Sequence, residues 1–252
     1  MIFHEYGGNN KPLVVLIHGV FQPWQTLLPI AKNFENEYRV IIPALNGHTS
    51  EETSHFISIE KEAEEIEKYI NSNYGNGVFA LFGLSMGGAI AYEILKNKKL
   101  IIKNAILDGA PLVSSGKFVS RIMENNYVQI AEKSKERNKK TLNNFSRNFL
   151  PEKYLQDYLS FIDNTDEQSI RNMVMSVVKG RFDATLRLSN TKLLYLHGTK
   201  ANEALAKKSS KLIAKHYPDA TVVCFKGDGH IECAIYEPDD WANVAKDFIE
   251  NR

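Results

Sequence analysis

Long apolar runs are missing from this 252-residue sequence. No run reaches the roughly 18 residues that are needed to cross a bilayer. The first residues also lack a basic start followed by an apolar segment, which is the pattern of a secretory signal. The sequence therefore predicts a cytoplasmic protein without a membrane span.

Cysteines and net charge are also scarce. Cys224 and Cys233 are too few for a disulfide framework, and no Cys-x-x-Cys or His-rich spacing indicates a metal site. Both are predicted to be reduced thiols, and neither a metal nor another cofactor is expected. The 31 basic and 30 acidic residues give a formal net charge of +1, which provides no field for a polyanion. Nucleic acid is therefore not expected as a partner.

What the sequence does contain is a series of short apolar runs rich in Val, Ile and Leu. Such runs are typical of strands covered on both faces, as in a parallel sheet. They are Leu13 to Ile17, Val40 to Ile42, Val78 to Phe82, Ala105 to Leu107, Leu193 to Leu196, and Thr221 to Phe225. Segments with helical spacing, such as Ile59 to Ile70 and Trp241 to Ile249, alternate with them. The alternation predicts an α/β fold with a mostly parallel central sheet flanked by helices.

The interval 112–189 breaks this alternation. It has helical spacing and many large side chains but no strand pattern. A structureless loop of this length would be unusual in a compact domain. We therefore expect a helical cap at 112–189, inserted into a core that is formed by 1–111 and 190–252.

The stretch Gly83-Leu84-Ser85-Met86-Gly87 fits the pattern G-x-S-x-G and follows the apolar run Val78 to Phe82. A helix-compatible run begins at Ala89. Glycines allow the sharp strand-to-helix turn that lifts a serine hydroxyl above the sheet. Ser85 is therefore predicted to be a nucleophile. The structural alternative is a serine that only caps the following helix.

A serine nucleophile needs a base and donors for the oxyanion that forms during attack. His230 is the candidate base, because it stands in a Gly-Asp-Gly-His loop after the last predicted strand. The amides of Met86, next to Ser85, and of Val20, after the first apolar run, are predicted to bind the oxyanion. His18 lies beside Val20 and is expected to orient this loop rather than to act as a base.

With these residues identified, the chain resembles the α/β-hydrolase superfamily, in particular its compact capped members of the esterase and lysophospholipase-like kind. HGVFQPW is similar to the oxyanion segment of the family, IPALNGHTSEE to its P-x-L-x-G-H-G-x-S segment, and GLSMGG to its nucleophile elbow. GDGH is similar to its histidine loop and EPDDWANVAKDFI to its closing helix. The resemblance implies an α/β-hydrolase fold with a cap before Leu193.

In a catalytic triad, the nucleophile and the base are joined by a third residue, a carboxylate that orients the imidazole of the base. The family usually places it three residues after the glycine that ends the next-to-last strand, where this sequence has Ala201. Asp108 is the first choice, because some lipases of this fold carry their acid at the end of the corresponding strand. Glu203 is the alternative, unless it only begins a helix, and the third option is a dyad without an acid or another acid. Asp228 is expected to shape the histidine loop.

Taken together, these residues predict a serine hydrolase that cleaves an ester or thioester of a small to medium acyl group. The substrate would be a small acyl molecule. The alternative is a protein of the same fold that binds or senses a small ligand with little or no catalysis. The fold does not exclude this alternative, and the missing acid at Ala201 favours it.

Overall fold

The computed structural model describes residues 1–250, and within them the chain forms a seven-stranded sheet. The strand order is β1-β3-β2-β4-β5-β6-β7, and every neighbouring pair is parallel except β1 with β3. The strands are β1 (Ile2–Tyr6), β2 (Leu13–Ile17), β3 (Arg39–Ala44), β4 (Gly77–Leu84), β5 (Ile101–Asp108), β6 (Lys192–Gly198) and β7 (Thr221–Phe225). All six apolar runs form strands, which confirms the predicted, mostly parallel α/β sheet. Only β1 was not predicted.

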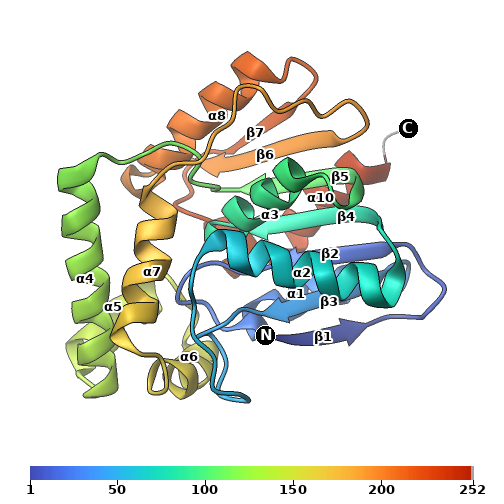
Figure 1. The fold of residues 1–252 in the computed structure, drawn as a ribbon. Coiled ribbons are helices and arrows are strands. Elements are labelled where there is room, and N and C mark those ends of the chain that lie inside the picture. The colour runs from blue at the N-terminus through green and yellow to red at the C-terminus, as the bar shows by residue number, and fades with distance from the viewer. Residues whose placement is uncertain (251–252) are drawn as a thin grey trace.

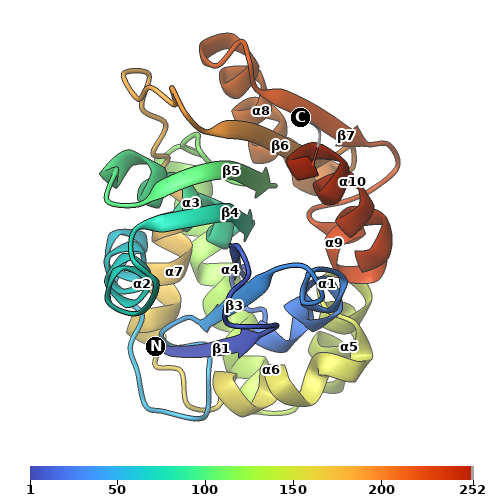
Figure 2. The same ribbon diagram turned by 90° about the vertical axis from the view of Figure 1, so that its right-hand side faces the viewer.

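Helices cover both faces of this sheet. They are α1 (Leu28–Phe34), α2 (Ile59–Tyr74), α3 (Met86–Asn97), α8 (Ala204–His216), α9 (Glu232–Tyr236) and α10 (Pro238–Glu250). Figure 2 shows α2 and α3 on one face of the sheet and α1 and α10 on the other. Within residues 1–250, no helix is both long and apolar enough to span a membrane.

The two faces of the sheet have separate apolar cores, because successive side chains of a strand point to opposite faces. On β5, Ala105 and Leu107 pack on the α2 and α3 side, whereas Ile106 packs on the α10 side together with Trp241. The inner strands are almost fully buried, but β7 is an edge strand with mostly exposed or half-exposed residues. The expectation of burial on both faces therefore fails for β7.

Four helices lie in the predicted insertion, among the residues described. They are α4 (Lys117–Lys135), α5 (Lys139–Asn148), α6 (Leu155–Ile162) and α7 (Glu167–Val178). Asn138 and Asp166 start α5 and α7, because each side chain accepts the amide hydrogen of the residue three positions later. We call α4 to α7 the inserted helices. The division into core and cap at residues 112 and 189 remains a prediction.

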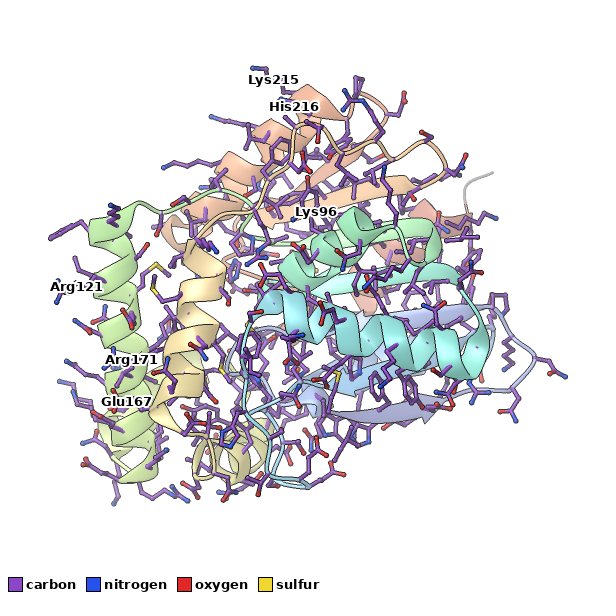
Figure 3. All side chains as sticks on the ribbon, in the orientation of Figure 1. Lys96, Arg121, Glu167, Arg171, Lys215 and His216 are labelled. Carbon is purple, nitrogen blue, oxygen red and sulfur yellow. The ribbon has the colours of Figure 1, made fainter. Side chains whose placement is uncertain are left out.

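The inserted helices pack on the carboxyl ends of the parallel strands, which the arrowheads of β4 and β6 mark in Figure 1. Their buried side chains, such as Phe145 and Tyr158, belong to the same apolar cluster as the α2 and α3 face of the sheet. Arg171 on α7 pairs with Glu167 one turn earlier and with Glu124 on α4, and Figure 3 shows Glu167 and Arg171 next to each other. The insertion is therefore continuous with the core rather than a separately packed body.

Five hydrogen bonds join the inserted helices and the turn between α6 and α7 to the loop between β3 and α2. Two of them join Ser50 Oγ to Ser160 Oγ at 3.5 Å and His55 Nδ1 to Asp166 Oδ2 at 2.7 Å. Thr165 Oγ1 donates to the Gly47 carbonyl at 2.8 Å. The Phe56 amide donates to Ser169 Oγ at 3.1 Å, and Asn172 Nδ2 donates to the Phe56 carbonyl at 3.0 Å. The ends of α6 and α7 are thus anchored to the core.

Candidate active site

The carboxyl ends of the parallel strands meet under the inserted helices, and the predicted site residues gather there. Ser85 follows β4, Asp108 ends β5, and the loops after β2, β6 and β7 complete the rim. In open α/β sheets this edge is where ligands bind.

Ser85 occupies a strained turn between β4 and α3. Its φ of 53° and ψ of −115° lie outside the regions that non-glycine residues prefer. A Cβ on Gly83 would come within 2.3 Å of the Gly87 carbonyl oxygen, and one on Gly87 within 2.2 Å of the Ile17 carbonyl oxygen. Only glycine fits at both positions. The Ser85 side chain makes no capping hydrogen bond to α3, so the capping alternative does not describe this serine.

His230 connects Ser85 to a carboxylate. Its Nε2 lies 2.8 Å from Ser85 Oγ, and its Nδ1 lies 2.7 Å from Glu203 Oε1. Since a carboxylate only accepts, Nδ1 carries the proton and Nε2 is free to accept the hydroxyl proton of Ser85. This is the geometry of a nucleophile, a base and an orienting acid.

Glu203 is completely buried in the 3₁₀ turn Ala201–Glu203 that precedes α8. Its Oε2 accepts the Gly198 amide hydrogen at 3.1 Å. Burial alone would raise the pKa of Glu203. The hydrogen bond and charge of His230 and the Gly198 amide outweigh it and leave the pKa below its ordinary value. Glu203 is therefore ionised at neutral pH and can stabilise an imidazolium.

Asp108, the first choice for the acid, does not make this contact. Its Oδ2 accepts the indole hydrogen of Trp241 at 2.9 Å, and His230 bonds to the alternative, Glu203. The alternation along β5 explains the difference, because Asp108 points to the same face as Ile106, toward α10. Burial raises the pKa of Asp108 to about 7, against the opposing effect of the Trp241 hydrogen bond.

The loops after β6 and β7 are joined by their backbones. The Asp228 carbonyl accepts the amide hydrogens of Thr199 and Lys200 at 2.8 and 2.9 Å. A Cβ on Gly198 would come within 2.4 Å of that carbonyl oxygen. The contact holds the histidine loop against the loop that carries Glu203. It uses the backbone of Asp228, so the loop-shaping role expected for this residue remains a prediction.

The predicted oxyanion donors are the amides of Met86, next to Ser85, and of Val20, in the loop after β2. Met86 is the first residue of α3, where an amide has no acceptor within the helix. In the loop after β2, the Gly19 amide donates to Gln22 Oε1 at 2.9 Å and the Phe21 amide donates to His48 Nε2 at 3.3 Å. Among residues 1–250, the Val20 amide between them has no hydrogen-bond partner. Both predicted amides are therefore available to a ligand.

Two buried histidines hold this loop. His18 Nε2 accepts the Leu45 amide hydrogen at 3.2 Å and Nδ1 donates to the Gly19 carbonyl at 2.9 Å. His48 accepts from Phe21 and donates through Nδ1 to the Asn46 carbonyl at 3.2 Å. Burial lowers the pKa of His18 to about 4. Burial, and the cost of placing a second positive charge next to His18, also hold the pKa of His48 well below its ordinary value. Both imidazoles are neutral, as the hydrogen bonds they accept require.

A pocket opens above Ser85 and encloses about 580 Å³ of empty space, part of it open to solvent. Apart from Ser85 and His230, its walls are mostly apolar. They comprise Val20, Phe21, Gln22, Tyr127, Ile130, Phe145, Phe149 and Ile231. The wall residues from α4 and α5 could not be identified from the sequence, because helical spacing also fits side chains that only pack the inserted helices. Within residues 1–250, no group of three or more His, Cys, Asp or Glu side chains is arranged to hold a metal ion.

A family model described as the alpha/beta hydrolase fold matches residues 12–185 of the chain. The chain belongs to the alpha/beta hydrolase fold family. This confirms the resemblance, the fold and the prediction of an enzyme of this hydrolase class. Among curated proteins, this hydrolase is 23% identical to a protein of Haemophilus influenzae with a provisional esterase/lipase assignment, over 88% of this chain and 77% of that protein.

Solved structures share the fold of this hydrolase at low sequence identity. An alpha/beta hydrolase family protein from Desulfitobacterium hafniense is similar with a TM-score of 0.75 and 21% identity, over 97% of this chain and 98% of that one. A carboxylesterase from Bacillus subtilis is similar with a TM-score of 0.72 and 15% identity, over 98% and 86%. A thermophilic esterase from Thermogutta terrifontis has a TM-score of 0.74 and 16% identity, over 99% and 92%.

Proposed function

We propose that this hydrolase is a serine esterase or thioesterase that acts on small to medium acyl groups and uses Ser85, His230 and Glu203. The observation that carries the proposal is the pair of hydrogen bonds from Glu203 through His230 to Ser85. The esterases among the relatives and structural neighbours agree with this reaction class.

In the proposed mechanism, Ser85 Oγ attacks the acyl carbonyl carbon while His230 Nε2 takes the hydroxyl proton. The amides of Val20 and Met86 bind the oxyanion. His230 then returns the proton to the departing alkoxide or thiolate, which leaves an acyl group on Ser85. Water, deprotonated by His230, releases the acid. Glu203 holds the imidazole in the correct tautomer and stabilises its protonated form.

The pocket favours acyl groups of limited size. Its walls are mostly apolar, and Ile130, Phe145 and Phe149 lie between it and a second hollow. An apolar acyl chain gains from burial there. A long chain would have to displace these side chains.

The proposal is tested with a fluorophosphonate probe followed by intact-protein mass measurement. The wild type should gain one covalent adduct at Ser85, and Ser85→Ala should gain none. Ser50→Ala, which removes an exposed serine hydroxyl, is the matched control and should label fully. In parallel, p-nitrophenyl esters of increasing chain length should be hydrolysed fastest at short to medium length.

A chain that takes up no probe and hydrolyses no ester of the series would refute the hydrolase proposal. It would favour the alternative of a protein that only binds a small ligand.

A further inference from the structure

A second hollow lies beside the pocket, between α4 and α5. It encloses about 930 Å³ of empty space, part of it open to solvent. Its polar wall residues are Asn126, Gln129, Lys133, Thr141, Asn144 and Asn148. We call this hollow the α4–α5 groove.

The groove adjoins the pocket that contains Ser85. Ile130, Phe145 and Phe149 line both of them. Phe145 is buried, whereas the side chain of Phe149 is 46% exposed and stands at the boundary between pocket and groove. A molecule with its reactive carbonyl at Ser85 therefore reaches the groove when the exposed Phe149 side chain turns aside.

The chemistry of the groove differs from that of the pocket. Its four side-chain amides each offer donors and an acceptor, and Lys133 adds a charged donor. Thr141 Oγ1 already donates to Asn138 Oδ1 at 3.2 Å and adds an acceptor. Among the residues described, the side chains of Asn126, Gln129 and Asn144 have no hydrogen-bond partner within the protein. Asn148 uses Nδ2 for the Asn144 carbonyl at 2.7 Å, which leaves its Oδ1 free. No carboxylate lines the groove.

This combination fits neighbouring hydroxyl groups best. A hydroxyl donates and accepts, as an amide does, so several hydroxyls can each pair with an amide of the groove. A cation would find no carboxylate there. A long alkyl chain would cover the amides without replacing their hydrogen bonds to water, which is unfavourable.

The mechanism indicates which half of the substrate lies in the groove. His230 protonates the leaving oxygen, and the freed alcohol has to reach solvent while the acyl group stays on Ser85. The apolar pocket suits the acyl group, and the groove is the polar space on the way to solvent. Resting on the proposed serine hydrolase function, we propose that the α4–α5 groove is an alcohol subsite that takes a neutral polyol, such as a sugar or a glycerol.

In the corresponding reaction, the Ser85 Oγ to acyl carbon bond forms and the bond from that carbon to the polyol oxygen breaks. The polyol leaves with the proton that His230 took from Ser85. Water then supplies the oxygen and hydrogen that release the carboxylic acid. No other co-reactant is needed.

The test compares butyrate esters that differ only in the alcohol: ethyl, glycerol, glucose and choline. In the wild type, kcat/KM should be at least about tenfold higher for the glycerol and glucose esters than for the ethyl and choline esters, on the scale of one or two added hydrogen bonds. Asn126→Ala and Asn144→Ala should each lower kcat/KM for the polyol esters about fivefold to tenfold. Their kcat/KM for the ethyl ester should not change.

Matched controls lie on the same helices. Asn125→Ala and Asn143→Ala remove exposed amides that do not line the groove and should leave all four esters unchanged. Arg121→Ala removes a charge on the outer side of α4 and should also have no effect (Figure 3).

Three results would overturn the subsite while fluorophosphonate labelling of Ser85 still supports a hydrolase. They are equal rates for polyol and ethyl esters, a preference for the choline ester, or equal losses on all four esters in the groove variants. Faster hydrolysis of ethyl gluconate than of glycerol butyrate would place the polyol on the acyl half and also overturn it. If Ser85 takes up no probe and no ester is hydrolysed, the proposed function fails and the subsite fails with it.

Discussion

Glu203 uses its two carboxylate oxygens for different partners, His230 Nδ1 and the Gly198 amide. In Glu203→Gln, the Gly198 amide can still only donate, so the introduced amide turns its oxygen toward Gly198 and its NH₂ toward His230. Nδ1 then has to accept, and the proton moves to Nε2, where it blocks the base. We expect kcat to fall about 10³-fold, on the scale of a triad acid replaced by its amide. Steady-state hydrolysis of p-nitrophenyl butyrate measures this.

Asp108→Asn is the comparison for that variant. The introduced amide oxygen can still accept from Trp241, and His230 keeps Glu203, so kcat should fall less than about tenfold. Losses of similar size in the two variants would contradict the assignment of Glu203. Urea unfolding of both variants controls for lost stability.

At the scale of single residues, the sequence pointed to those that stand in rigid motifs. The glycines around Ser85 and before His230 admit few backbone arrangements, so the motifs fix where these side chains point. Glu203 was only the alternative, because its place depends on a 3₁₀ turn that brings it back over Gly198. Asp108 has a favourable sequence context, but the alternation along β5 turns it toward Trp241. Gln22 and His48 stand in segments that resemble family motifs, but the sequence did not show that their side chains hold the loop after β2.

At the scale of elements, the loop after β2 depends on the loop after β3 for its shape. Phe21 has a φ of 59°, and its amide donates to His48 Nε2. His48→Phe keeps an aromatic ring among Phe56 and Phe161 but removes the acceptor, so the Phe21 amide is left unsatisfied. Because the Val20 donor is loosened rather than removed, kcat should fall about tenfold to hundredfold, somewhat less than for a deleted oxyanion donor.

The measurement for His48→Phe separates kcat from KM. An oxyanion contact acts in the transition state, so KM should stay within about twofold, and fluorophosphonate labelling should slow in parallel with kcat. A rise in KM with unchanged kcat would instead indicate damage to the pocket wall.

Elements were predictable where burial is strong. β2 and β4 lie inside the sheet and are apolar almost throughout, and β5 has a short apolar run at Ala105 to Leu107. β1, with the sequence IFHEY, mixes apolar and polar residues because it lies at an antiparallel edge, and it was missed. Thr221 to Phe225 was predicted as a strand, but its exposure follows from its place at the other edge, which a single run cannot show.

At the scale of the whole molecule, buried neutral histidines make stability depend on pH. The pKa of His18 is 6.5 ordinarily and about 4 in the folded chain. As the pH falls below 6.5, the unfolded chain binds the proton first, so the free energy of unfolding decreases down to pH 4. The shift corresponds to about 3 kcal/mol from this residue.

Urea titrations at pH 7 and pH 4 measure the effect. His18→Gln should lose about 3 kcal/mol less between the two pH values than the wild type, whatever its stability at pH 7. A His18→Gln variant with the wild-type loss would show that other groups cause the acid sensitivity.

The overall architecture followed from the alternation of runs, because a parallel sheet with crossover helices leaves few topologies. The helical content of 112–189 was also predictable. Its packing was not, since amphipathic helices of this length can fold onto each other or onto the sheet. Phe145 and Tyr158 join the core of the sheet, and this depends on contacts between residues far apart in the sequence.

The anchoring of α6 and α7 to the loop at Gly47 and Phe56 bears on turnover. Five hydrogen bonds hold that side closed, so an opening motion that keeps them intact has to move α5 instead. On the moving side, α5 is joined to α9 by the Tyr236 hydroxyl, which donates to the Ser146 carbonyl at 3.3 Å. In many enzymes, product is released no faster than such a segment opens. We therefore expect the rate at which α5 opens, rather than the chemistry at Ser85, to set the upper limit on kcat.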